Sequence, residues 1–251
     1  MNMLTLLEWN LHKMTHSAPV PPFVCRRILS PDPDLICLVE YRTDPGIRAA
    51  LKNTYWVAES TPASGNQVLL AVRRTLAPKG IQVVRREEEP GCFNLLHICF
   101  SYGEKRSLSL LGVRMLSPMD ASQQTPPLNQ YLSQLDGPFL CAGDFNILGR
   151  RMPVWFPSYP KEVSVGTGPL ARVSYLYSDS SGTATGGGDP DHTLCSPGLT
   201  VRAQYQWDFT SDDPIYPNPV AAMHGGRWDL PPCFPDHAIL WAQVRPSGKM
   251  G

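Results

Sequence analysis

The sequence predicts two packed β-sheets with helices on their outer faces. Segments typical of strands outnumber helical ones, and the 26 prolines and 20 glycines keep the elements short. The clearest periodic segment, residues 199–209, alternates apolar and polar side chains, which indicates a strand with one face in solvent. Sheets and helices bury their apolar faces as stacked layers. A sandwich of 251 residues usually stays undivided, so we expect one domain over residues 1–251.

The first predicted elements are a strand and a short helix. Residues 3–10 form an apolar run that ends in Asn10, as expected of a buried strand. Residues 22–29 fit a helix that stops before Pro31 and Pro33, because proline lacks the amide hydrogen that a continuing helix needs.

The middle of the chain supplies most of the predicted strands. Residues 34–40 are almost continuously apolar up to Glu40, which suits a strand buried on both faces. Residues 46–53 fit a helix. Three further apolar segments are predicted as strands: residues 67–74, 93–102 and 107–116.

The second half of the chain is less regular. We predict a helix at residues 128–135, a strand running into a loop at 138–146, and the last strand at 237–244. Residues 149–190 and 211–235 are rich in Pro, Gly, Ser and Asp and carry no clear pattern. Loops of this length in a compact domain are usually functional or mobile.

Charge and cysteine content narrow the class of protein. Lys and Arg number 22, as do Asp and Glu, so the formal net charge is zero. This balance argues against a tight non-specific DNA binder but allows one local basic strip. Seven cysteines without a CxxC pair indicate a reducing compartment and no zinc site. We find no secretion signal and no bilayer-spanning apolar stretch. We therefore expect a cytoplasmic chain without integral membrane association, and a monomer.

Polar clusters recur where the predicted apolar strands end. Each cluster alone is weak, because an Asp-His pair is usually a surface pair and Gly and Asn suit ordinary turns. Together they are hard to explain as surface features, since catalytic groups are often placed at strand ends on a rigid scaffold. The clusters are Glu8-Trp9-Asn10, Glu40, Gly143-Asp144-Phe145-Asn146, Asp191-His192 and Asp236-His237.

These clusters, in this order, resemble the endonuclease/exonuclease/phosphatase superfamily, which includes exonuclease III-like and DNase I-like nucleases, sphingomyelinases and inositol polyphosphate phosphatases. Gly143-Asp144-Phe145-Asn146 is the most specific match. Val39-Glu40 stands where the family usually has Gln-Glu, and Pro235-Asp236-His237 resembles its closing Ser-Asp-His. The resemblance implies a DNase I-like, four-layer α/β sandwich with two central, mostly antiparallel sheets flanked by helices. It also implies a phosphoesterase that depends on Mg²⁺ or Mn²⁺.

The resemblance and the side-chain chemistry together assign a metal site. Mg²⁺ prefers hard oxygen ligands, one or two of them carboxylates. Glu40 is suited to be the principal ligand, with Asn10 and Asp236 beside it.

The remaining motif residues fit roles around a phosphate. Asp144 is suited to orient and deprotonate the attacking water, and Asn146 can donate to a phosphoryl oxygen. His237, when protonated, can donate to the same phosphate. Asp191 would accept from the other ring nitrogen of His237 and fix its orientation.

Arg114 marks a departure from the family pattern. Many members carry His or Tyr at the end of the strand before the Gly-Asp-Phe-Asn strand, and here that position is Arg114. Arginine cannot act as a general acid, because its pKa exceeds about 12. It can clamp a phosphate with two parallel donors. The alternative is a solvated arginine on a strand face.

Other residues have functional and structural interpretations. His97 is expected to be a core histidine, His192 to point away from the site by strand alternation, and His224 to lie outside it. Two motifs remain open. Basic and aromatic residues at 150–159 could hold phosphates and stack bases or could anchor a loop, and Gly186-Gly187-Gly188 could cradle phosphate or form a linker.

We conclude from the sequence that the chain hydrolyses phosphodiesters, with nucleic acid or a nucleotide as the favoured substrate. A phosphatase or lipid phosphodiesterase is the alternative, although no Trp-Cys-Asp-Arg signature of inositol phosphatases precedes or follows Asp191. An inactive binding module is a further alternative, which the four carboxylates of the clusters disfavour. The cleavage polarity, the preferred metal and the substrate itself stay open.

Overall fold

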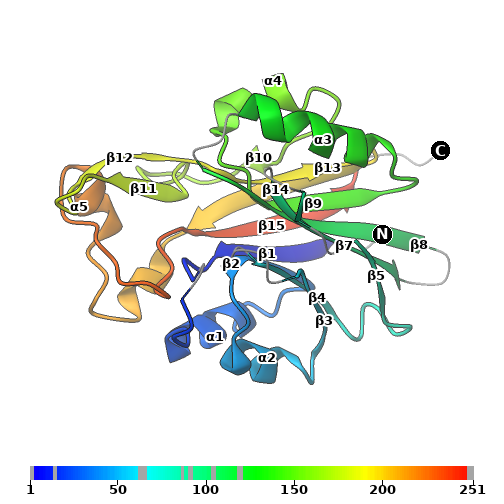
Figure 1. Cartoon of the computed structure of the whole chain (residues 1–251), viewed down its shortest axis with the longest axis horizontal. Helices are drawn as coiled ribbons and strands as arrows, with labels where there is room; N and C mark the ends of the chain where they lie inside the picture. Colours follow the sequence, from blue (N-terminus) through cyan, green and yellow to red (C-terminus); the bar gives the residue numbers. More distant parts are fainter. Residues whose placement is uncertain are drawn as a thin grey trace.

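The computed structural model describes residues 3–13, 16–61, 67–85, 88–89, 93–102, 106–117 and 121–247. In these residues two large β-sheets pack face to face, and helices cover the outer face of each (Figure 1). The predicted four-layer sandwich with two mostly antiparallel sheets is therefore confirmed.

The first sheet has seven strands in the order β10-β14-β15-β1-β2-β4-β3. The central pair, β1 and β2, is parallel, and every side chain of β2 is buried, which explains its apolar sequence. Of the other pairs, β10 with β14 is parallel and the rest are antiparallel. The strands are β1 (Leu4–Asn10), β2 (Leu35–Tyr41), β3 (Tyr55–Glu59), β4 (Gln67–Arg73), β10 (Val163–Ser164), β14 (Leu199–Gln206) and β15 (Ile239–Pro246).

The second sheet has six strands, in the order β13-β9-β8-β7-β5, with the short β6 also paired to β7. Among the strands described in this sheet, β8 and β9 are parallel and the other pairs are antiparallel. The strands are β5 (Ile81–Arg85), β6 (Glu88–Glu89), β7 (Phe93–Tyr102), β8 (Arg106–Met115), β9 (Phe139–Asp144) and β13 (Asp191–Cys195).

Helices form the outer layers and a hairpin extends one end. Helices α1 (Pro22–Leu29) and α2 (Pro45–Leu51) cover the first sheet, and α3 (Ala121–Ser133) and α4 (Met152–Trp155) cover the second (Figure 1). A separate hairpin of β11 (Tyr175–Ser178) and β12 (Ala184–Gly188) projects beyond the sheets. The remaining turns of helix are η1 (Gly149–Arg151), η2 (Asp208–Ser211) and α5 (Pro219–Met223). None of the helices in the described ranges is long and apolar enough to cross a bilayer.

Two predicted elements differ from the structure by three residues or more at one end. The helix predicted at 128–135 is α3, which starts at Ala121 because the Gln124 side chain bonds both main-chain groups of Leu116 and holds the first turn. The strand predicted at 199–209 ends at Gln206, and Trp207 and Phe209 join the core on the opposite face of the sheet. The pattern-free residues 149–190 and 211–235 contain β10, β11, β12, α4 and α5.

Candidate active site

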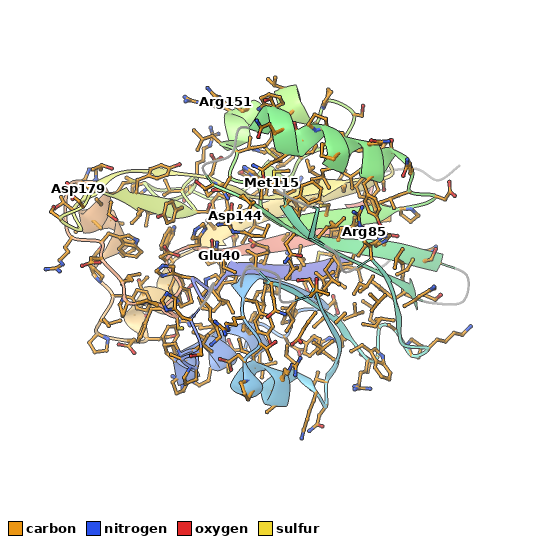
Figure 2. The ribbon with its side chains drawn as sticks, viewed as in Figure 1. Glu40, Arg85, Met115, Asp144, Arg151 and Asp179 are labelled. Atoms are coloured by element: carbon orange, nitrogen blue, oxygen red, sulfur yellow. The ribbon has the colours of Figure 1, made fainter. Side chains whose placement is uncertain are left out.

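Five strand ends meet at one end of the sandwich. Asn10 and Glu40 come from β1 and β2 of the first sheet, while Arg114 and Asp144 are paired on β8 and β9 of the second. Asp191 begins β13 and is paired with Asp144. Figure 2 shows the labelled side chains of Glu40 and Asp144 near each other between the two sheets.

The predicted residues surround one cavity of about 390 Å³. Asn10 and Asp191 lie beneath its floor, fully buried and bonded to residues that line it. The structure thus brings together all eight residues that the sequence singled out. The lining residues are His12, Glu40, Arg114, Ser117, Asp144, Asn146, Leu148, Tyr175, Tyr177, Pro190, Asp236 and His237.

The Gly-Asp-Phe-Asn motif has a steric reason at its first position. Gly143 has φ +143°, and a Cβ there would lie 1.9 Å from the main-chain oxygen of Val113 on the neighbouring strand. After the glycine, Asp144 Oδ1 accepts a hydrogen bond of 2.8 Å from Asn146 N, and Asn146 Nδ2 donates to Met115 O at 2.7 Å. These bonds fix the turn that presents Asp144 to the cavity.

Asp144 is a buried carboxylate with a raised pKa. Asn10 Nδ2 donates to its Oδ2 at 3.1 Å, and Arg114 Nε lies 3.4 Å from the same oxygen. Burial raises its pKa, the nearby Arg114 charge opposes this, and the Asp191 carboxylate adds to the rise, leaving a pKa of about 6. At neutral pH the group is ionised and is a better base than an exposed aspartate.

Glu40 and Arg114 form a buried ion pair. Arg114 Nε donates to Glu40 Oε1 at 2.9 Å, and its second terminal nitrogen, Nη2, bonds the same oxygen. Burial pushes the pKa of Glu40 up, but the Arg114 and His237 charges outweigh burial and hold the pKa below its usual value. Arg114 Nη1 is buried with no hydrogen-bond partner in the described residues. Arg114 is therefore not a solvated surface arginine.

His237 and Asp191 form a second buried pair. His237 Nδ1 lies 2.7 Å from Asp191 Oδ2, and the Tyr175 ring packs against the imidazole with centroids 4.5 Å apart. Burial alone would lower the pKa of His237, but the Asp191 carboxylate outweighs it and raises the pKa to about 10. At neutral pH the ring is an imidazolium with its Nε2 proton left for the cavity.

The sequence was compared with models of known protein families. The family model described as Endonuclease/Exonuclease/phosphatase family matches residues 7–212. The chain belongs to this family. A search of curated proteins finds no match.

Several solved structures share the fold of this family member. Truncated TDP2 of Caenorhabditis elegans has a TM-score of 0.67 at 14% identity, with 97% of this chain and 98% of that chain covered. TDP2 of D. rerio in complex with a single-strand DNA product has a TM-score of 0.64 at 14% identity, covering 98% and 100%. ANGEL2, a 2′,3′-cyclic phosphatase in complex with adenosine-2′,3′-vanadate, has a TM-score of 0.65 at 13% identity, covering 97% and 96%.

Two sets of side chains in the site could hold a divalent cation. Asp144, Asp191 and His237 offer ligand atoms within 4.8 Å of one another. In that set, however, protonated His237 has no free lone pair for a metal, and its Nδ1 already donates a hydrogen bond to Asp191. The set predicted from the sequence, Asn10, Glu40 and Asp236, has oxygen ligands only, and Asn10 Oδ1 already accepts from His12 N at 3.0 Å.

The oxygen set fits a hard cation better. Asp236 Oδ1 is buried without a hydrogen-bond partner in the described residues, and burial raises the pKa of Asp236. A cation beside this oxygen would offset the desolvation of the carboxylate. The donor set also matches the oxygen preference of Mg²⁺.

Sequence patterns missed four polar or aromatic residues of the cavity wall: His12, Ser117, Tyr175 and Tyr177. Tyr175 and Tyr177 lie on β11, within residues 149–190. The sequence of its partner strand β12 is rich in glycine and shows no alternation, so no hairpin was predicted there. His12 follows Asn10 by two residues, with φ +48°, and its Nδ1 lies 3.9 Å from Asp236 Oδ2. The proximity of His12 to the Trp9-Asn10 motif was the one feature of the sequence that could have predicted its place in the site.

The other histidines lie where the sequence placed them. His97 is buried and bonds Tyr131 Oη at 2.8 Å. His192 turns away from the cavity and bonds Glu162 and the main-chain oxygen of Ile147, both at 2.9 Å. His224 is exposed after α5 and does not line the site.

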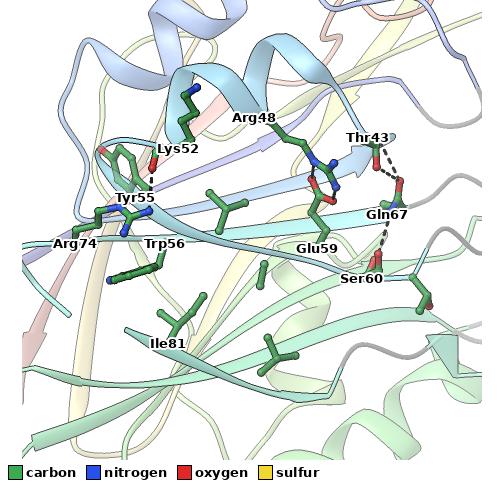
Figure 3. A pocket seen from close by; sticks show the side chains of 14 residues that line it. Thr43, Arg48, Lys52, Tyr55, Trp56, Glu59, Ser60, Gln67, Arg74 and Ile81 are labelled. Atoms are coloured by element: carbon green, nitrogen blue, oxygen red, sulfur yellow. Dashed lines mark hydrogen bonds and ion pairs between the residues drawn. The ribbon is translucent and has the colours of Figure 1, made fainter. Parts of the chain in front are cut away.

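A larger cavity of about 850 Å³ lies elsewhere, between edge strands β3 and β5 (Figure 3). Three of its four charged side chains are engaged: Arg48 bonds Glu59, and Arg74 stacks on Trp56 with its guanidinium 3.8 Å from the ring centre. It holds none of the motif residues, so size alone does not mark the active site.

Proposed function

We propose that this family member hydrolyses phosphodiester bonds of nucleic acids or nucleotides with the help of Mg²⁺ or Mn²⁺. The observation that carries the proposal is one cavity lined by an aspartate of raised pKa, an imidazolium, and an arginine whose Nη1 has no hydrogen-bond partner in the described residues. A base and two donors around one point are what attack of water on a phosphate requires.

Asp144 is the proposed general base. It is held by Asn10 and by the turn to Asn146, so its orientation is fixed before substrate binds. With a pKa of about 6 it is ionised at neutral pH and can take a proton from water. Such help is typically worth about 10²–10⁴ in rate.

His237 and Arg114 are the proposed electrostatic groups. Asp191 positions His237 and keeps it protonated, so that Nε2 can donate to a phosphoryl oxygen. Arg114 is anchored on Glu40 through Nε and keeps Nη1 for a second phosphoryl oxygen. Asn146 lies at the rim, where its side-chain amide retains one N–H beyond its bond to Met115.

Glu40, Asn10 and Asp236 would hold the cation. Bound there, it would supply Lewis-acid stabilisation of the phosphate charge. Both hydrogen bonds from Arg114 to Glu40 go to Oε1, so Arg114 leaves Oε2 of Glu40 for the cation.

A nucleic-acid or nucleotide substrate is supported by two facts. The structural relatives were solved with a single-strand DNA product and with an adenosine vanadate compound. In this chain Tyr177 leaves 39% of its surface exposed at the cavity wall, where a base could stack on it.

The proposed enzyme is a cytoplasmic monomer. Its six described cysteines are free, as expected in a reducing compartment.

The test is an activity screen with Mg²⁺ and Mn²⁺ over single- and double-stranded DNA, RNA, abasic DNA, sphingomyelin and inositol phosphates. We expect turnover of at least one nucleic acid that stops in EDTA. Turnover confined to sphingomyelin or to inositol phosphates would replace the proposal with the lipid phosphodiesterase or phosphatase alternative.

A further inference from the structure

A second cavity of about 620 Å³ adjoins the candidate active site. We call it the basic cavity, because Arg150, Lys161 and Arg172 line it. Leu148 lines both cavities and forms part of the wall between them.

Two of its three cations are uncommitted. Arg150 and Arg172 are exposed, and neither makes a hydrogen bond or an ion pair within the ranges that the structure describes. Lys161 Nζ lies 3.9 Å from Glu162 Oε1, too long for a hydrogen bond.

Of the two acidic residues that line the basic cavity, Glu162 is bonded inside the protein and Asp189 is bonded to the cavity wall. Glu162 is buried and bonds His192 Nδ1 at 2.9 Å and Thr193 N at 2.8 Å. Burial alone would lower the pKa of His192, but the Glu162 charge outweighs burial and raises it, so Glu162 interacts with a group inside the protein. Asp189 Oδ1 accepts from Gly149 N at 2.9 Å. The three cations outnumber the two carboxylates, so the net charge of the residues lining the basic cavity is positive.

Two glycines lie in the wall of the basic cavity, Gly149 and Gly188. A Cβ on Gly149 would lie 2.3 Å from Asp189 Oδ2 and 2.5 Å from Lys161 Nζ, so a side chain there would displace both groups. A Cβ on Gly188 would lie 2.3 Å from Tyr177 Oη and 2.8 Å from Leu148 Cδ2. Tyr177 and Leu148 thus meet over Gly188 and form the border between the basic cavity and the active site.

We propose that the basic cavity binds a phosphate next to the scissile one in a polynucleotide, with the intervening nucleoside over Leu148 and Tyr177. This inference rests on the proposed function and specifies its substrate as a chain of at least two phosphates. Arginine binds phosphate through paired donors, and an exposed aromatic ring stacks a base regardless of sequence. A lipid headgroup would leave the Tyr177 ring without a partner, so the geometry favours a nucleic acid.

The test compares the parent enzyme with Arg150→Ala/Arg172→Ala and with Arg26→Ala as a matched control. Arg26 is exposed on α1, which covers the other sheet. Binding of a fluorescein-labelled ten-residue oligothymidylate is measured by anisotropy in EDTA at several salt concentrations. Turnover of the oligonucleotide and of bis(4-nitrophenyl) phosphate, which has one phosphorus, is measured with Mg²⁺.

We expect the double variant to bind the oligonucleotide at least about 10-fold more weakly, as removal of charge-assisted bonds implies. The slope of its log K against log salt should shrink by about 0.7 for each phosphate that the variant no longer neutralises. Its kcat/KM should fall at least about 10-fold more for the oligonucleotide than for the small diester, while Arg26→Ala changes neither.

Parent-like oligonucleotide affinity and salt slope in the double variant would overturn the inference. Binding of phosphatidylserine vesicles is measured alongside, and a loss confined to these vesicles would also overturn the inference, because it would point to a lipid surface. If the parent cleaves no diester but the double variant still loses oligonucleotide binding, the basic cavity stands and the proposed hydrolysis fails.

Discussion

Arg114 is the residue whose substitution tests the site most sharply. Its Nε anchors it on Glu40 at 2.9 Å and lies 3.4 Å from Asp144, while Nη1 has no partner in the described residues. Arg114→Lys keeps a positive charge beside the carboxylates but removes the free Nη1 donor. Arg114→Ala removes both.

The two substitutions should differ in kind. A hydrogen bond to a charged group contributes about 1.5–3 kcal/mol, so Arg114→Lys should lower kcat by about 10- to 100-fold with little loss of stability. Removing one partner of a buried ion pair costs about 3–5 kcal/mol. For a chain of this size that is a drop in Tm of roughly 6–20 °C. Arg114→Ala should show this drop in addition to at least the same loss of kcat.

The assay is kcat and KM for bis(4-nitrophenyl) phosphate with Mg²⁺, together with thermal unfolding of each variant. Arg202→Ala serves as the control, because Arg202 is exposed on β14. Parent-like kcat in Arg114→Lys would show that the free nitrogen does not contact the phosphate. Parent-like kcat in Arg114→Ala would remove Arg114 from the mechanism altogether.

Four further predictions concern the same site. EDTA should abolish activity and Mg²⁺ or Mn²⁺ restore it, whereas full activity in excess chelator would exclude the proposed metal. Asp144→Asn should lower kcat by at least about 10² with an unchanged Tm, and near-normal turnover would place the base elsewhere. Rates should fall below about pH 6, where Asp144 gains a proton, and above about pH 10, where His237 loses one. Asp191→Asn should move the upper pH limit well down, and an unchanged upper limit would refute the pairing of Asp191 with His237. Gly143→Ala should unfold or misplace the turn, because its Cβ overlaps Val113, and a parent-like Tm would contradict this steric argument.

The limits of sequence-based prediction are visible at the hairpin β11–β12. Its strand Ala184–Gly188 has the sequence Ala-Thr-Gly-Gly-Gly, which carries neither alternation nor β-branched residues beyond one threonine. Gly187 and Gly188 are there because Val173, Tyr177 and Leu148 occupy the space of their missing side chains, and Gly186 has a φ of +145°. A requirement imposed by neighbours distant in sequence leaves no local pattern, so the sequence left this segment between a phosphate cradle and a linker.

The aromatic residues after the Gly-Asp-Phe-Asn motif show the same ambiguity. Phe156 packs on Phe145 with centroids 5.7 Å apart, and Tyr159 packs on Phe139 at 5.3 Å, so these rings anchor the loop. Arg150, in contrast, turns to a cavity. Interleaved basic and aromatic residues in a sequence do not reveal which of them face solvent.

The sequence by itself determined the two-sheet sandwich and the identity of the polar residues at its strand ends. It could do so because burial of a central strand such as β2 demands a continuous apolar run, and a steric contact at Gly143 demands glycine. Only the tertiary structure decided what these residues do to one another. Arg114 lies against Glu40 because β8 and β2 belong to facing sheets, and Asp191 lies 2.7 Å from His237 across 46 residues of chain. Such contacts set the charge and pKa of each group through distances in space, and no spacing along the chain encodes them.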